Sequence, residues 1–207
     1  MAEALADPVS GLILAGGEGR RMGGADKGLL SFQGRPLITP VIERLAPQVV
    51  ALTISANRNL DAYRAFGYPV LADRSAERRG PLGGLQAGLA ACRTPWLVIC
   101  PCDCPALPAD LVARLLAAAT EHRASLAVAV VAGRMQPTFQ LCRRELLPAL
   151  DDFLAAGERR AGLWCRTQGA VEVSFPDPAA FANLNHPQTL YQPPAVAHDP
   201  LHDRKLE

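Results

Sequence analysis

The chain has 207 residues, of which 49% are hydrophobic and 20% charged, and this mixture predicts a globular domain rather than a disordered or fibrous protein. Its 21 basic and 20 acidic residues give a net charge of +1. The charge balance therefore excludes a general attraction to nucleic acid or to an anionic membrane, and any site for an anion has to be local.

Short apolar runs alternate with helical spacing along the chain. Residues 10–15 (SGLILA) form an apolar run followed by glycine, which indicates a buried strand. We expect further strands at 49–55, 70–71, 96–100, 125–132, 138–141 and 170–175, and helices at 36–46, 59–66, 82–92, 109–122 and 143–156. Because the early strands are apolar on both faces, the alternation predicts an α/β fold, a mostly parallel sheet with helices on both faces.

One domain is expected over residues 10–190, preceded by an amino-terminal tail at 1–9. Residues 191–207 hold three prolines and five charges with almost no apolar pattern, which predicts a flexible carboxyl-terminal tail. Sheets of the expected kind bind ligands at the carboxyl ends of their strands. The loops that directly follow strands are therefore the candidates for chemistry.

The location of the protein is expected to be cytoplasmic. No run approaches the roughly 18 apolar residues that a membrane span needs, and the first ten residues carry two acids and no basic residue, unlike a secretory signal. The six cysteines are then expected to be thiols. Three of them lie in the segment C-P-C-D-C-P at 100–105, but no second cysteine pair completes a zinc site, so buried thiols are the favoured interpretation and a thiol metal carrier ranks last.

A glycine-rich, basic loop follows the first expected strand. Residues 14–29 read LAGGEGRRMGGADKGL, with six glycines that let backbone N–H groups point at an anion, and with Arg20, Arg21 and Lys27 as cations. This pattern predicts a phosphate-binding loop. It matches neither the spacing of a P-loop nor that of a dinucleotide-binding fingerprint.

Three further segments place polar groups where strands are expected to end. Asp103 follows the apolar run at 96–100 and is a candidate Mg²⁺ ligand, because that ion takes one or two carboxylates and fills its shell with phosphate oxygens and water. Asp73 precedes a loop with a Gly80-Pro81 turn, and its carboxylate is a candidate acceptor from a nucleoside. Arg74, Arg78 and Arg79 either meet a second anionic substrate or are solvated surface residues. Asn183 and Asn185 are the last candidates, because they would point to the same side of an extended segment.

Together these motifs resemble a known family. The pattern L-A-G-G followed by R-M-G-G-A-D-K-G-L, then G-P-L-G-G, P-C-D-C-P, A-G-E-R-R and a late N-x-N closely resembles the molybdenum cofactor guanylyltransferases, from about residue 11 to residue 190. That family belongs to the nucleotidyltransferases, so the resemblance implies a Rossmann-like, three-layer α/β fold. It also implies transfer of GMP from Mg-GTP to the terminal phosphate of molybdopterin, with release of pyrophosphate.

The resemblance also implies a role for each matching position. The catalytic residues would be Arg21, Lys27 and Asp103, with Asp103 as the Mg²⁺ ligand. Asn183 and Asn185 would lie on the pterin side. The nucleotide would contact Leu14, Ala15, Gly16, Gly17, Lys27, Ser55, Asp73, Gly80, Pro81, Leu82 and Asp103.

The chain departs from the family pattern in two places. Ser55 stands where the family can have an asparagine that touches the nucleotide, with Asn57 two residues later. His186-Pro187-Gln188 follows the N-x-N motif in place of T-P-E. Both departures bear on binding rather than on the phosphate chemistry.

Several alternatives stay open. The donor could be CTP, the acceptor a sugar phosphate, or the chain a nucleotide-binding adaptor without turnover, although the intact Lys27 and Asp103 argue against an adaptor. No nucleic acid or membrane is expected as a partner. The partners are expected to be GTP and molybdopterin, with proteins that deliver molybdopterin or mature molybdoenzymes, and the chain is expected to be a monomer.

Overall fold

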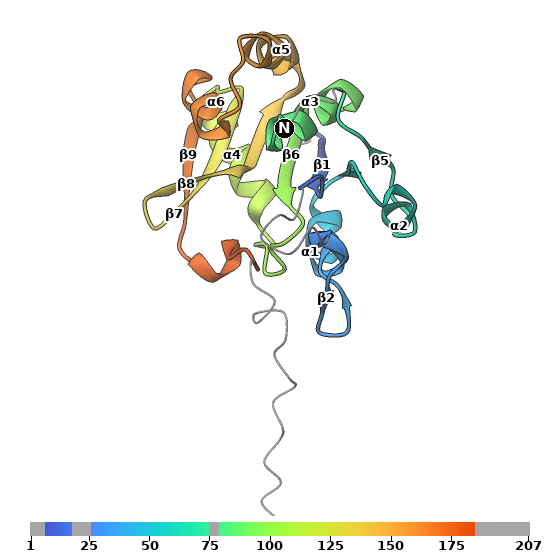
Figure 1. Cartoon of the computed structure of the whole chain (residues 1–207). Coiled ribbons are helices and arrows are strands. Elements are labelled where there is room, and N and C mark those ends of the chain that lie inside the picture. The colour runs from blue at the N-terminus through green and yellow to red at the C-terminus, as the bar shows by residue number, and fades with distance from the viewer. Residues whose placement is uncertain (1–6, 18–25, 75–78, 185–207) are drawn as a thin grey trace, which may run out of the picture.

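The computed structural model of the chain describes residues 7–17, 26–74 and 79–184. Within these residues a seven-stranded sheet runs in the order β5-β4-β1-β6-β8-β7-β9 (Figure 1). Its strands are β1 (Val9–Leu14), β4 (Ala51–Ser55), β5 (Val70–Leu71), β6 (Trp96–Pro101), β7 (Leu126–Val131), β8 (Arg134–Arg143) and β9 (Val171–Phe175). Only β8 runs antiparallel to its neighbours, β6 and β7, so the sheet is mostly parallel as predicted.

The described residues form six α-helices around the sheet. They are α1 (Ile38–Leu45), α2 (Leu60–Arg64), α3 (Pro81–Ala91), α4 (Leu111–Glu121), α5 (Leu147–Ala155) and α6 (Ala161–Thr167). Short 3₁₀ turns complete the described chain at η2 (Lys27–Leu29), η3 (Ala46–Gln48), η4 (Arg144–Leu146) and η5 (Pro178–Phe181), with a small hairpin of β2 (Ser31–Phe32) and β3 (Arg35–Pro36). No helix of the described residues is long and apolar enough to cross a membrane.

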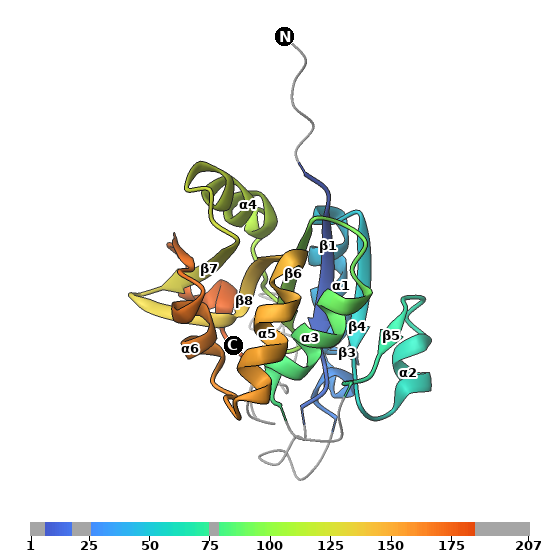
Figure 2. The same cartoon turned by 90° about the horizontal axis from the view of Figure 1, so that it is seen from above.

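Two hydrophobic cores lie on opposite faces of the sheet, which confirms the three-layer α/β architecture. Alternate side chains of β1 enter different cores, since Ile13 packs with α1 and α4 on one face and Leu12 with α3, α5 and α6 on the other. In Figure 2, α3 and α5 lie side by side on their face. Because helices cover both faces, β6 and β7 are apolar along nearly their whole length.

Most predicted elements are confirmed, with bounds shifted by a few residues, and β5 matches residues 70–71 without a shift. The strand expected at 138–141 is longer, because β8 pairs with β7 through a tight turn in which Ala132 and Gly133 have φ of 48° and 72°. Pairing with β6 carries the strand through Arg143. The helix expected at 143–156 therefore begins only at Leu147, after the turn η4.

Other differences concern the ends and two small elements. The sheet starts at Val9, one residue before the expected domain boundary, and the carboxylate of Asp7 accepts a hydrogen bond of 3.2 Å from the Trp96 indole. Helix α6 and the β2–β3 hairpin were not predicted. The tail expected at 191–207 lies outside the described residues.

The sheet changes direction of winding between β1 and β6. The chain passes from β1 through β4 to β5 at one edge and then returns to place β6 on the other side of β1. The carboxyl ends of these strands consequently meet at a topological switch point, the usual ligand crevice of such sheets. The segments that start there are 14–17, 55–59 and 101–104.

Candidate active site

Backbone hydrogen bonds join the three strand ends beyond the strands themselves. The Ala15 N–H donates to the Ser55 carbonyl at 2.7 Å, and the Cys102 N–H donates to the Leu14 carbonyl at 3.1 Å. The start of the glycine-rich loop is thereby fixed between the ends of β4 and β6. The predicted nucleotide contacts Leu14, Ala15 and Gly16 are therefore brought beside Asp103.

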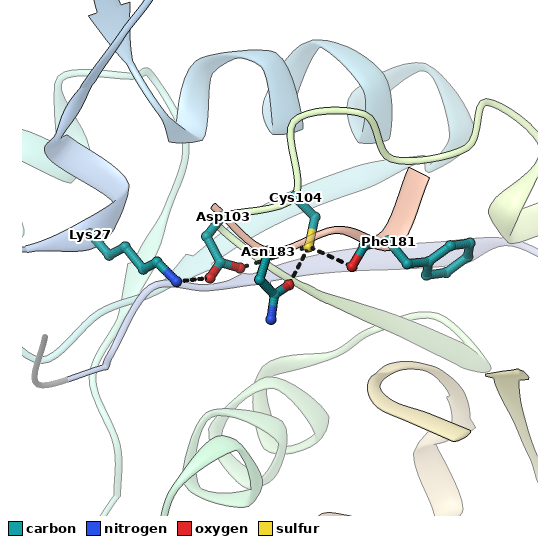
Figure 3. Close-up of polar contacts among 5 residues, drawn as sticks. All are labelled: Lys27, Asp103, Cys104, Phe181 and Asn183. Carbon is teal, nitrogen blue, oxygen red and sulfur yellow. Dashed lines mark hydrogen bonds and ion pairs between the residues drawn. The ribbon is translucent and has the colours of Figure 1, made fainter. Parts of the chain in front are cut away.

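Lys27 and Asp103 form an ion pair within this crevice. Figure 3 shows the Lys27 ammonium pointing at the Asp103 carboxylate, and the contact is to Asp103 Oδ2. Asp103 is only 6% exposed, so its negative charge needs a cation close by. The far end of the glycine-rich loop and the residue predicted to bind metal therefore lie together at one place.

Asn183 is brought to the same site from the carboxyl-terminal part of the domain. The Cys104 thiol donates to the side-chain oxygen of Asn183 and lies 3.7 Å from the Phe181 carbonyl (Figure 3), and the Leu184 N–H donates to the Asp103 carbonyl at 3.0 Å. Phe181 is anchored in turn by an edge contact with Phe139, with ring centroids 4.8 Å apart. Asn183 thus lies next to the Asp103 loop, whereas its predicted partner Asn185 lies outside the described residues.

Asp73 lies on the other side of the crevice, after β5 and against the first turn of α3. Helix α3 begins at Pro81 after Gly80, which confirms the predicted turn, and a Cβ added at Gly83 would come within 2.8 Å of Asp73 Oδ2. Burial raises the pKa of the Asp73 carboxyl, and the Asn57 side chain and the charge of Arg79 oppose that rise. A partly buried carboxylate with a perturbed pKa in a crevice is a candidate for a functional residue.

The remaining predicted residues divide into three groups. Ser55 is 1% exposed, with its hydroxyl turned toward Gly84 of α3, so its side chain is part of the packing beneath the crevice. Arg79 points toward α5, because its guanidinium donates to Gln86 Oε1 at 2.9 Å and Gln86 donates to Asp151 at 2.5 Å. Arg74 is exposed, and Arg21 and Arg78 lie outside the described residues.

The cysteines of the C-P-C-D-C-P segment are buried thiols, as predicted. Burial raises the pKa of Cys100, Cys102 and Cys104. The thiolate is the metal-binding form, so these groups are poor ligands. Across the residues that the structure describes, no three His, Cys, Asp or Glu side chains gather in a group that could hold a metal ion.

Sequence reasoning missed the polar residues that follow β4. Arg58 donates to the Gly17 carbonyl at 3.1 Å, and Asn59 donates to Asp26 Oδ2 at 3.0 Å. Tyr63 of α2 donates to the other oxygen of Asp26. The run N-R-N at 57–59, directly after the carboxyl end of a buried strand, is the signal that could have found them.

Known proteins resemble the chain over almost its whole length. A family model described as a MobA-like NTP transferase domain matches residues 11–171. A molybdenum cofactor guanylyltransferase from Bordetella petrii is 47% identical over 190 residues, which are 90% of this chain and 97% of the relative. A protein of the same name from Cupriavidus taiwanensis is 49% identical over 184 residues, 86% of this chain and 92% of the relative.

Solved structures agree with the fold. Molybdopterin-guanine dinucleotide biosynthesis protein A from Archaeoglobus fulgidus has a TM-score of 0.71 at 17% identity, covering 87% of this chain and 94% of that one. A 2-C-methyl-D-erythritol 4-phosphate cytidylyltransferase from Thermus thermophilus has a TM-score of 0.64 at 19% identity, covering 86% and 94%. At such low identities these likenesses concern the fold alone.

Proposed function

Because the chain belongs to the family of MobA-like NTP transferase domains, we propose that it transfers GMP from GTP to the terminal phosphate of molybdopterin. The products are pyrophosphate and the guanine dinucleotide form of the cofactor. The observation that carries the proposal is the meeting of Lys27, from the phosphate loop, with the buried Asp103 at the switch point of the sheet. Relatives 47% and 49% identical over at least 86% of the chain are named for this activity.

The reaction needs no nucleophilic side chain. A terminal phosphate oxygen of the acceptor attacks the α-phosphorus of GTP, a new P–O bond forms, and the bond between the α-phosphorus and the bridging oxygen breaks as pyrophosphate leaves. The protein contributes position and charge neutralisation. In this assignment Arg21, Lys27 and the backbone N–H groups of Gly16 and Gly17 hold the phosphates. Leu14 and Ala15 contact the nucleotide by other atoms, since the Ala15 N–H already donates to the Ser55 carbonyl.

A divalent cation is part of the proposal, with Mg²⁺ as the ion and Asp103 as its protein ligand. The site fits, because the nearly buried Asp103 carboxylate already carries one cationic group, the Lys27 ammonium. A single carboxylate also suits Mg²⁺, which takes the rest of its shell from phosphate oxygens and water. When bound, the ion would neutralise charge on the phosphates. Lys27 would then release Asp103 and turn to the phosphates.

The two sides of the crevice would hold different parts of the substrates. Asp73 and the start of α3, with Gly80, Pro81 and Leu82, would line the nucleoside side, above the packed Ser55. Asn183 and Asn185 would contact the pterin. The position of Asn183 beside Asp103 supports this division, since the reacting phosphates have to lie between the two substrates.

We also propose that the enzyme is a monomer and is located in the cytoplasm. It would receive molybdopterin from other proteins and pass the product on to other proteins. All six cysteines are free thiols and buried, as expected where the solution is reducing.

Thermal unfolding with GTP, CTP, ATP or UTP, each with Mg²⁺, tests the donor. A nucleotide at 100 times its dissociation constant adds about 2.7 kcal/mol of stability, or about 5–10 °C for a chain of this size. We expect such a shift with GTP, followed by pyrophosphate release once molybdopterin is added. A shift with CTP alone would indicate a cytidylyltransferase, and binding of GTP without pyrophosphate release would indicate an adaptor.

A further inference from the structure

The segment that follows β4 holds both described ends of the glycine-rich loop. At the first end, Arg58 donates to the Gly17 carbonyl at 3.1 Å. At the second end, Asn59 and Tyr63 each donate to one oxygen of the Asp26 carboxylate. One short stretch of chain, residues 58–63, therefore sets the separation between Gly17 and Asp26.

Asp26 is the residue from which Lys27 starts. The turn η2 (Lys27–Leu29) begins directly after Asp26, and the Asp26 carbonyl accepts a hydrogen bond of 3.1 Å from the Leu29 N–H. The side chain of Asp26 is thus fixed by α2 while its backbone fixes η2. Because Asp26 and Lys27 are adjacent in the chain, a shift of the Asp26 backbone displaces the Cα of Lys27 with it, and the two side-chain contacts of Asp26 oppose such a shift.

Tyr63 is the buried member of this arrangement. Tyr63 is 0% exposed, and its ring belongs to the core that contains α1 and α4. A Cβ added at Gly28 would come within 2.6 Å of the Tyr63 hydroxyl oxygen, so the phenol also lies directly against η2. Burial, with the hydrogen bond to Asp26, raises the pKa of the phenol, and the hydroxyl remains a neutral donor.

We propose that Tyr63, acting through Asp26, is a positioning residue that sets where the Lys27 ammonium lies in the crevice. The proposal rests on the proposed function, in which Lys27 stabilises the phosphates as pyrophosphate leaves. Tyr63 is buried and touches no substrate in this assignment, and its hydroxyl acts by holding Asp26. Because Lys27 acts on charge that grows in the transition state, its misplacement lowers kcat more than it weakens GTP binding.

The test is Tyr63→Phe, which keeps the buried ring and removes only the hydroxyl. We expect kcat for pyrophosphate release with GTP and molybdopterin to fall roughly ten- to hundredfold, with KM for GTP changed by less than about threefold. Tyr68→Phe is the matched control, since it removes a hydroxyl five residues along from a partly buried ring, and it should leave kcat unchanged. A second variant, Asn59→Gly, removes the other donor to Asp26 at a residue whose φ of 48° suits glycine, and kcat should fall in the same direction.

A double-mutant cycle separates positioning from mere stabilisation. If Tyr63 acts through Lys27, Tyr63→Phe should have no further effect on kcat in a Lys27→Met background. A general loss of stability would instead lower kcat by the same factor in the wild-type and the Lys27→Met backgrounds. An unchanged kcat in Tyr63→Phe, or equal effects in the two backgrounds, would overturn the positioning role while the wild-type protein stays active. A wild-type protein without turnover would overturn the proposed function itself, and the role of Tyr63 with it.

Discussion

The Lys27 ammonium and the Asp103 carboxylate, 76 residues apart in the chain, meet as an ion pair at the switch point of the sheet. Lys27 contacts the same carboxylate that the proposed Mg²⁺ would use. In the proposed function Asp103 would hold the metal ion in place of Lys27, and Lys27 would then contact the incoming phosphates. The buried Asp103 carboxylate would thereby have a cationic partner both with and without the metal.

Replacement of Asp103 by Ala should abolish turnover, because it removes the proposed metal ligand and the anchor of Lys27. The measurement is pyrophosphate release at saturating Mg²⁺ and GTP. Asp152→Asn, at an exposed carboxylate on α5, is the control and should retain full activity. Near-normal turnover in Asp103→Ala would show that the metal assignment is wrong.

Lys27→Met keeps the length of the side chain and removes its charge. We expect kcat/KM to fall roughly 30- to 1,000-fold, which corresponds to a loss of about 2–4 kcal/mol of transition-state stabilisation. The reason is that one preorganised cation is lost from the leaving phosphates. Arg144→Met removes an exposed cation elsewhere and serves as the comparison. A loss of GTP affinity as large as the loss of kcat/KM would mean that Lys27 binds substrate and transition state equally.

Asp73→Asn should stabilise the protein in a pH-dependent way. Burial raises the folded-state pKa of this carboxyl, so its ionised form costs stability above that pKa and the cost disappears as the pH falls below the unfolded value. The variant should therefore have a higher Tm than wild type at pH 8, and the difference should shrink toward pH 4. Binding of GTP should weaken in the same variant, and an equal Tm difference at both pH values would contradict the role of burial.

Two glycines of α3 should respond differently to alanine. A Cβ at Gly83 meets Asp73 Oδ2 at 2.8 Å, so Gly83→Ala should displace the carboxylate and cost about 1.5–3 kcal/mol, or more than tenfold, in GTP affinity. A Cβ at Gly88 meets Leu12 Cδ2 at 2.6 Å in the core, so Gly88→Ala should lower stability by about 1–3 kcal/mol, less any gain in helix propensity. Titration calorimetry with GTP should find unchanged affinity in Gly88→Ala.

Features that depend on neighbouring residues were predictable from the sequence. The apolar runs at β1 and β6, the glycines after β1, and Asp103 after β6 are local patterns, and parallel strands bring such ends together without further information. The same reasoning explains why the crevice holds both Lys27 and Asp103. Their direct contact follows from the packing of η2 against the Asp103 loop.

Features that depend on distant pairing were not predictable in this way. The length of β8 is set by its two neighbours, β6 and β7, rather than by its own partly polar sequence. The hydrogen bond from Tyr63 to Asp26 joins residues 37 apart, and nothing near Tyr63 distinguishes it from an ordinary core tyrosine. Arg79 was expected to be a ligand or a solvated side chain, and its hydrogen bond to the buried Gln86 was not predicted.

The contacts of Phe181, Asn183 and Leu184 with the Asp103 loop have a consequence for synthesis of the protein. A nascent chain that has emerged as far as β8 already holds the switch point and the phosphate loop, and domains begin to fold from the amino-terminal side during synthesis. It still lacks the segment that closes over Cys104. Under the proposed function, a growing chain would form its nucleotide side before its acceptor side. It would become competent for transfer only when almost the entire domain has left the ribosome.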